Sequence, residues 1–332
     1  MAGIKGVGEG AVESIIQERE ENGPFKNIYD FVERTSLQQV NKKSIEALAT
    51  AGAFDNLDHI GRGQYFVKDD REITFIENLV RYGNKYQNDK NSNQQSLFGG
   101  AQTIEISKPA VPETNDWQKL EKLKKEKEYI GVYLSAHPLD DYKFEFENFC
   151  NSKLSEFDDL ESLRNRDLTI GGIVSEVKHA MTKTGKPFGF LTIQDYTDTF
   201  RFALFGKDYE NFRKYCYEDY PLLIKGKVQP RPYNDQVLEF KIKSIIMLTQ
   251  VREEMIKGIT FTMPYDIVNE NFINELKACT SEKEGNTMIK FKIIDREANA
   301  AVDFISRSKG ILITDKLVNY LQRNSDIQYS VY

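Results

Sequence analysis

The residues best suited to chemistry in this sequence are glycines and lysines close to the N-terminus. The run Lys5-Gly6-Val7-Gly8 continues to Gly10, and an apolar pattern that predicts a helix follows at once. Glycines let backbone N–H groups approach a phosphate closely, and the N-terminus of a helix adds partial positive charge. The stretch therefore predicts a turn that binds a phosphate backbone, with Lys5, Gly6, Val7, Gly8 and Gly10 as the contacting residues.

A second turn with the same layout follows. Residues 28–34 predict a short helix and 35–40 a turn, and a helix capped by Asn41 then ends before Gly52. Without a Gly-x-Gly step, this turn depends more on Lys42 and Lys43 for phosphate contacts. Residues 1–60 carry six basic and ten acidic side chains, so any grip on DNA must be local and weak. The alternative is a small helical bundle whose glycines only make turns.

The remaining reactive side chains do not form a recognisable metal or catalytic site. Two-metal nucleotidyl transfer needs closely paired carboxylates, but the sequence has no Asp-x-Asp pair, and its adjacent aspartates are better explained as turn and solvent positions. The three cysteines and three histidines are widely separated, which suits a reducing cytoplasm and argues against zinc. We expect no catalytic residue, metal or other cofactor in this chain.

Residues 86–115 predict a flexible linker that carries a binding peptide. The segment is polar or proline-containing, and Leu97 and Phe98 form its compact pair of large apolar residues. A segment unable to bury such residues locally stays mobile, and another protein can supply the pocket. Gln94 and Ser96 complete the pattern Gln-x-Ser-Leu-Phe, although five residues can also match by chance.

Five strand-like runs follow, with turn signals between them and one helical stretch at 209–217. The runs are 168–178, 188–194, 199–205, 222–229 and 237–247. This order matches a five-stranded OB barrel, which presents its second and third strands to single-stranded nucleic acid.

Alternation along the strands separates the core of this barrel from its outer face. Leu191 and Ile193 share the expected core face, which leaves Phe188 and Phe190 on the other side. Aromatic rings can stack on bases while nearby cations follow the phosphates. The candidate single-strand-binding residues are Lys178, Lys183, Lys186, Phe188, Phe190, Arg231 and Tyr233. Residues 168–248 carry twelve basic and nine acidic groups, and this modest excess leaves a barrel used for protein contact as the alternative.

The last segment predicts a small two-layer domain with the order β-α-β-β-α-β over residues 256–332. The whole chain is then a multidomain α+β protein of 332 residues with a formal net charge of −6. Its parts are a helical double-hairpin region at 1–85, a linker at 86–115, a helical connector at 116–167, the barrel at 168–248 and the terminal domain at 256–332. No run approaches the about 20 apolar residues of a membrane span.

Several motifs resemble known families. The glycine turn and its partner resemble the helix-hairpin-helix family, which grips duplex backbone without reading sequence. The pattern Gln-x-Ser-Leu-Phe resembles the peptide by which bacterial proteins dock on the sliding clamp of replication. Most specifically, "IKGVGEGAVESI", "TAGAFD", "QQSLFG" and "EKEYIGVYLSAHPLDDY" in that order are similar to the alpha subunit of bacterial DNA polymerase III.

This resemblance covers essentially the whole chain but only the carboxy-terminal part of that family. It implies a tandem helix-hairpin-helix region, an internal clamp-binding peptide, a single-strand-binding barrel and a terminal domain that contacts the clamp loader in some members. The family's polymerase aspartates lie upstream of this sequence, so the resemblance implies no nucleotidyltransferase site here.

The resulting expectation is a portion of a replicative polymerase that binds double- and single-stranded DNA, tethers to the clamp and supports processive replication. Two other possibilities stay open. One is a stand-alone binding module without a polymerase partner. The other is an RNA-binding protein built on the barrel, which a preference for RNA over DNA would reveal.

Overall fold

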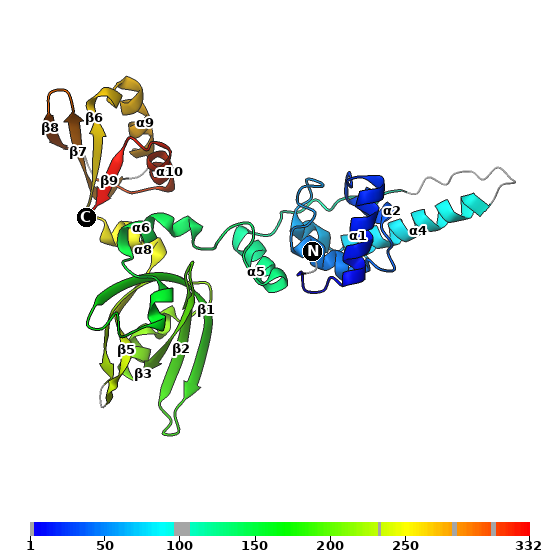
Figure 1. The fold of residues 1–332 in the computed structure, drawn as a ribbon, viewed down its shortest axis with the longest axis horizontal. Helices are drawn as coiled ribbons and strands as arrows, with labels where there is room; N and C mark the ends of the chain where they lie inside the picture. Colours follow the sequence, from blue (N-terminus) through cyan, green and yellow to red (C-terminus); the bar gives the residue numbers. More distant parts are fainter. Residues whose placement is uncertain (1–2, 96–106, 232–233, 281–283, 307–309) are drawn as a thin grey trace. The chain divides into compact units, whose positions relative to one another are not determined.

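The computed structural model describes residues 3–95, 107–231, 234–280, 284–306 and 310–332. These residues divide into two compact units, Met1–Pro138 and Leu139–Tyr332 (Figure 1). Within the described ranges, no helix has both the length and the apolar character needed to cross a membrane.

The first unit is helical. Its elements are α1 (Glu9–Asn22), α2 (Ile28–Arg34), α3 (Lys42–Thr50), the 3-10 helix η1 (Arg62–Phe66), α4 (Phe75–Gln95) and α5 (Lys119–Ile130). The predicted cap is present, because the Asn41 side chain accepts from the Ser44 N–H at 3.1 Å. Gly52 follows α3 with φ +81°, a conformation that favours glycine at a helix end.

Helices as short as α2 and α3 are marginal alone, so tertiary packing must stabilise them. Ile28 and Phe31 of α2 are buried in one core with Ile45 and Leu48 of α3, and Leu79 of α4 belongs to the same core. The apolar spacing noted in the sequence therefore builds one helical core that holds both hairpin turns.

The structure narrows the predicted linker at both ends. Helix α4 continues to Gln95, ten residues into that segment. Hydrogen bonds help to anchor its polar extension, because the Gln87 amide donates to the carbonyls of Val32 and Thr35 at 2.9 and 2.8 Å. At the other end, the carbonyls of Pro109 and Pro112 accept hydrogen bonds from Tyr29 and Gln64.

The second unit contains the predicted barrel. Its elements are β1 (Asp167–Met181), β2 (Pro187–Gln194), β3 (Thr199–Phe205), α7 (Lys207–Phe212), η4 (Arg213–Tyr215), β4 (Pro221–Arg231) and β5 (Asn234–Met247). The strands form an antiparallel sheet in the order β3-β2-β1-β4-β5. Leu191, Ile193, Phe202 and Leu204 are buried inside it, as alternation predicts.

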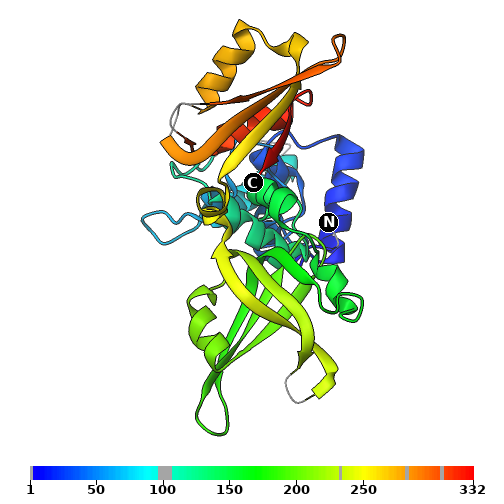
Figure 2. The same cartoon turned by 90° about the vertical axis from the view of Figure 1, so that its left-hand side faces the viewer.

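The terminal domain also has the predicted order. It comprises β6 (Gly258–Pro264), η5 (Tyr265–Ile267), α9 (Glu270–Thr280), β7 (Glu284–Asp295), β8 (Ala300–Ile305), α10 (Asp315–Arg323) and β9 (Gln328–Val331). The sheet order is β8-β7-β6-β9, and β6 and β7 are parallel (Figure 2). Strand β8 is therefore an edge strand.

The predicted helical connector is divided between the units. Helix α5 belongs to the first unit, whereas η2 (Asp140–Tyr142), α6 (Lys143–Phe149) and η3 (Leu154–Asp158) belong to the second. There, Arg252 of α8 (Leu248–Met255) pairs with Glu145 of α6 at 2.5 Å and with Asp315 of α10 at 2.6 Å. This largely buried guanidinium joins three elements that lie far apart in sequence.

Candidate nucleic-acid interface

The first candidate site is the turn before α1. Gly6 has φ +96°, and the Val7 N–H donates to the Ile4 carbonyl at 3.1 Å to close the turn. The Val7 side chain is buried in the helical core, while Lys5 and Gly8 are exposed. The sequence therefore places a packed side chain beneath an exposed backbone.

That exposed backbone provides hydrogen-bond donors. Gly8 is the N-cap of α1, and within the described residues the amides of Gly8, Glu9 and Gly10 have no hydrogen-bond acceptor. The first amides of a helix lack intrahelical partners and suit an anion. No heavy atom lies within 4 Å of a Cβ built at Gly8 or Gly10, so the approach is open. Glu9, in the first turn, is the one acidic group there.

The two lysines of the second turn differ from each other in their ion pairing, which the sequence did not predict. The Lys42 ammonium lies 2.6 Å from a Glu77 carboxylate oxygen and 3.5 Å from Glu46. The hydrogen bond to Glu77 is the main reason that the pKa of Lys42 is raised. Lys43 is exposed. The two predicted lysines thus differ, because Lys42 is already paired with acids of its own unit and Lys43 faces solvent.

A buried ion-pair network supports the first turn. Arg62 binds Asp55 at 2.6 Å and the fully buried Glu126 of α5 at 2.7 Å. Helix α5 in turn provides the Tyr129 carbonyl that accepts from the Lys5 N–H at 2.7 Å. Arg62 and Glu126 are 64 residues apart, and no local pattern in the sequence signals their pairing.

The same glutamate holds the chain that follows α5. The carboxylate of Glu126 accepts from the N–H groups of Leu134 and Ser135, each at 3.0 Å, and from the Ser135 hydroxyl at 2.7 Å. Burial disfavours its charged form, but the hydrogen bonds from Ser135 and Arg62 outweigh that effect and lower the pKa of Glu126. The carboxylate is thus fully engaged as a structural group.

The second candidate site is the outer face of β2 and β3. Phe188 stacks on Phe205, its partner across the strands, with ring centroids 5.1 Å apart, and meets Phe190 edge-on at 5.5 Å. The Arg201 guanidinium lies 3.9 Å from the Phe190 ring centroid. Phe188 and Phe190 are half-buried, and Phe205 and Arg201 are exposed. Three aromatic rings and a cation thus share one face.

The predicted cationic side chains around this aromatic face differ in their ion pairing and exposure. Lys178 of β1 is opposite Phe190 in the ladder and pairs with Glu176 at 2.7 Å. Lys183 and Lys186 are exposed in the β1–β2 turn. Arg231 is exposed at the end of β4, 3.7 Å from Glu239. Tyr233 lies outside the described residues.

Sequence reasoning missed Phe205 and Arg201. The signal was available, because Arg201, Ala203 and Phe205 alternate with the buried Phe202 and Leu204. Faces are assigned from the sequence only in the second strand, so the outer residues of the third strand have no predicted role.

The predicted clamp-binding peptide falls mostly outside the described structure. Gln94 belongs to the last turn of α4. Ser96, Leu97 and Phe98 lie outside the described residues.

Three family models match successive parts of the chain. Residues 1–65 match a helix-hairpin-helix motif, and residues 168–248 match an OB-fold nucleic-acid-binding domain. Residues 259–332 match the C-terminal domain of the DNA polymerase III alpha subunit. The first two matches cover the glycine turn and the aromatic face, respectively.

Curated relatives carry the same description over most of this chain. The DNA polymerase III subunit alpha of Haemophilus influenzae is 27% identical over 86% of the chain, which spans 24% of that protein. The corresponding subunits of Pseudomonas aeruginosa and Thermus aquaticus are 26% and 28% identical over 92% and 89% of the chain, which spans 26% and 23% of those proteins. The chain thus spans about a quarter of the length of these relatives. Over most of its length it is similar to DNA polymerase III alpha subunits, and the match of residues 259–332 to the C-terminal domain of that subunit indicates the carboxy-terminal portion.

Proposed function

We propose that this chain binds DNA on behalf of a replicative polymerase and tethers it to the sliding clamp, so that synthesis is processive. The observation that carries the proposal is the outer face of β2 and β3, where Phe188, Phe190 and Phe205 lie together with Arg201. Rings that accept bases by stacking, next to a cation, suit single-stranded nucleic acid of any sequence. In a replicative setting this strand is the template ahead of the primer end.

The glycine turn supports a second contact, to duplex backbone. The unsatisfied amides at Gly8, Glu9 and Gly10 can donate to phosphate oxygens, and the exposed Lys5 adds charge. At the second turn, Lys43 is the better phosphate ligand because Lys42 is held by Glu77. Few cations are available, so duplex affinity should be modest and sensitive to salt.

Weak contacts of this kind suit a tethered protein. A clamp-binding peptide at Gln94, Ser96, Leu97 and Phe98 would keep the chain at high effective concentration near its DNA, so the DNA contacts themselves need not be tight. The terminal domain would then serve protein docking, with a clamp-loader subunit as one possible partner.

Clamp binding tests the proposal directly. The full chain is titrated onto a bacterial sliding clamp by surface plasmon resonance, alongside a Leu97→Ala/Phe98→Ala variant. A matched control, Ile104→Ala/Ile106→Ala, removes two apolar residues from the same stretch of sequence. Binding in roughly the micromolar range that is lost only in the first variant is expected. Equal binding by both variants would move the contact elsewhere, and no binding by any form would remove the tether from the proposal.

A comparison of single strands separates the replication role from an RNA-binding one. Binding to DNA and RNA oligonucleotides of one sequence is measured by fluorescence anisotropy. Equal or tighter binding to DNA is expected, because stacking on Phe188 and Phe190 does not use the 2′-hydroxyl. A clear preference for RNA would favour an RNA-handling protein built on the same barrel.

A further inference from the structure

Strand β8 of the terminal domain has an unusual surface. Every residue of this strand is exposed, although it contains Val302, Phe304 and Ile305, whose exposed fractions are 51, 51 and 59%. A strand with large apolar residues normally buries at least one face against its own domain.

Among the described residues, no strand pairs with the side of β8 that faces away from β7. Its ladder to β7 continues to Ser306, whose N–H donates to the Ile289 carbonyl at 3.0 Å. In an antiparallel ladder, alternate residues direct their N–H and C=O groups toward the neighbour. Counting back from Ser306, the backbone groups of Ala301, Asp303 and Ile305 therefore face away from β7, toward the open edge.

Edge strands of stable proteins usually carry protection against pairing, such as lysine, proline or a bulge. Strand β8 reads Ala-Ala-Val-Asp-Phe-Ile, with one acidic residue and no lysine or proline. Its register with β7 is continuous. The edge therefore lacks these protective features, and another strand can pair with it.

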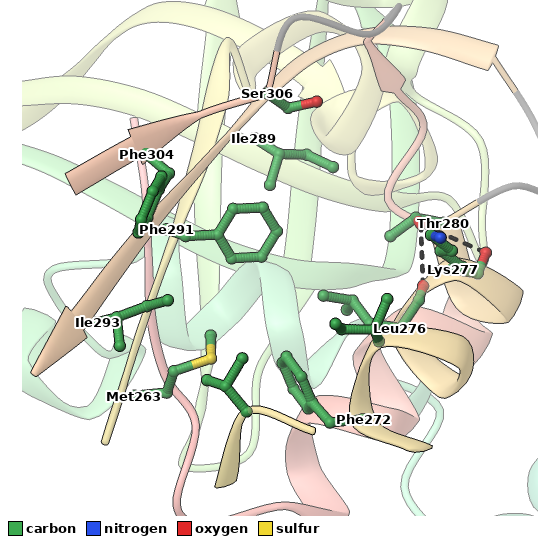
Figure 3. Close-up of a pocket in the computed structure, with 12 residues that line it drawn as sticks. Met263, Phe272, Leu276, Lys277, Thr280, Ile289, Phe291, Ile293, Phe304 and Ser306 are labelled. Atoms are coloured by element: carbon green, nitrogen blue, oxygen red, sulfur yellow. Dashed lines mark hydrogen bonds between the residues drawn. The ribbon is translucent and has the colours of Figure 1, made fainter. Parts of the chain in front are cut away.

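An apolar groove adjoins this edge. It has a volume of about 460 Å³ and lies between α9 and the strands β7 and β8. Figure 3 shows Phe304 and Phe291, from neighbouring strands, on one side of the groove, with Phe272 and Leu276 of α9 across from them. Lys277 also lines the groove, and its ammonium forms no ion pair within the described part of the chain.

We propose that a partner protein completes this sheet by adding an extended segment beside β8, with apolar side chains at alternate positions and a carboxylate that meets Lys277. Such strand addition gains main-chain hydrogen bonds from the open edge and specificity from alternate side chains. The inference rests on the docking role proposed above for the terminal domain, and it specifies how that docking occurs.

The exposure pattern favours a strand over a helix. Phe304 lies on the face that carries α9, and so does Val302, two residues away, whereas Ile305 lies on the opposite face. A helix in the groove would cover only the first pair. An added strand contributes side chains to both faces and covers all three residues.

The charge pattern favours a different protein over a second copy. Antiparallel pairing of β8 with its own copy places two Asp303 carboxylates on the same face of the joined sheet, opposite or two residues apart. Like charges in such positions are destabilising. A foreign strand avoids this repulsion and can provide the acid for Lys277.

The test uses position 303, where the two relevant properties can be separated. Asp303→Pro removes an outward N–H without breaking a bond to β7, a change that edge strands tolerate. Asp303→Ala keeps the N–H and removes only the charge. Displayed random peptides of about ten residues are selected on the full chain, and the enriched sequences are synthesised and titrated onto both variants by isothermal calorimetry.

Enriched peptides with apolar residues at every second position are expected, with binding weakened at least about tenfold by Asp303→Pro and little changed by Asp303→Ala. Single-stranded DNA binding by the same variants should stay at the wild-type level, which separates this test from the DNA-binding proposal. Peptides with helical spacing that bind the proline variant normally would show that a helix fills the groove. Failure to enrich any peptide, or a dimer of the chain that the proline variant abolishes in sedimentation, would equally overturn the inference.

Discussion

Phe190 provides the sharpest test of whether the aromatic face of β2 and β3 binds single-stranded nucleic acid. Its ring lies between Phe188, edge-on at 5.5 Å, and the Arg201 guanidinium, 3.9 Å from the ring centroid. Stacking of one base on an aromatic side chain contributes about 1–3 kcal/mol. Removal of the ring also frees Arg201 to approach a phosphate, which offsets part of the loss. We therefore expect Phe190→Ala to weaken single-strand binding by about 1–2 kcal/mol, or roughly 5- to 30-fold.

The assay is fluorescence anisotropy with a labelled oligothymidine at several salt concentrations. A stacking residue does not displace counterions, so the salt dependence of Phe190→Ala should match the wild type. In contrast, Arg201→Ala should reduce the slope of log K against log salt by about 0.7 for each lost phosphate contact. Tyr217→Ala is the matched control, since this ring is 58% exposed and packs against Tyr220, in the segment between η4 and β4.

Thermal unfolding of each variant is measured to confirm that the barrel is intact. Affinity of Phe190→Ala within twofold of the wild type, or an equal loss in Tyr217→Ala, would refute the assignment of this face. The barrel would then be better explained as a surface for protein contact.

Three further predictions concern the fold that holds these sites. Glu126→Gln should lower the free energy of unfolding of the first unit by about 2–3 kcal/mol in urea titrations, because it leaves the buried Arg62 only partly paired. Hydrogen bonding lowers the pKa of Glu126 in the folded state. Its carboxylate therefore stabilises the fold at a pH above the ordinary glutamate pKa of about 4.3, and this stabilisation disappears as the pH falls through the lower pKa of the folded state. Glu126→Gln should lose this part of the dependence of unfolding free energy on pH. Gly6 has φ +96°, and an added Cβ would lie 3.4 Å from the Ala47 methyl. Gly6→Ala should therefore lower the free energy of unfolding by about 1–2 kcal/mol. The control Gly3→Ala, at a position with open surroundings, should change the free energy of unfolding by less than about 0.5 kcal/mol. Burial, aided by a nearby aspartate, raises the pKa of the Cys150 thiol to about 12, so iodoacetamide at about pH 8 should alkylate it on the order of a thousandfold more slowly in the folded chain than in urea; fast modification of the native protein would contradict this.

Periodic features of the sequence predicted the fold well. The helix at 28–34 was located at its observed bounds, and the order of strands and helices along the second unit followed from apolar runs and turns. Alternation also placed Phe188 and Phe190 opposite the buried Leu191 and Ile193. Each of these inferences depends on a repeat of two or of 3.6 residues, which neighbouring side chains determine among themselves.

The features that escaped prediction depend on contacts between distant residues. Helix α4 continues past its apolar pattern because Gln87 binds carbonyls of α2 and the turn that follows it. Arg62 and Glu126 meet only after the chain has folded. The sequence suggests that Lys42 can bind phosphate, but in the fold α4 places Glu77 next to it. Charge in a sequence predicts a ligand contact poorly, since the fold decides which charges neutralise one another.

The Glu126 network has a practical consequence for dissecting this protein. The helix-hairpin-helix match ends at residue 65, and a fragment cut there would appear complete by sequence. Such a fragment would lack the carboxylate that pairs with Arg62 and the Tyr129 carbonyl that receives Lys5. A fragment that extends through Ser135 keeps both, as well as the amides that satisfy Glu126. A fragment that keeps these contacts of the helix-hairpin-helix region is therefore about twice as long as its recognisable motif.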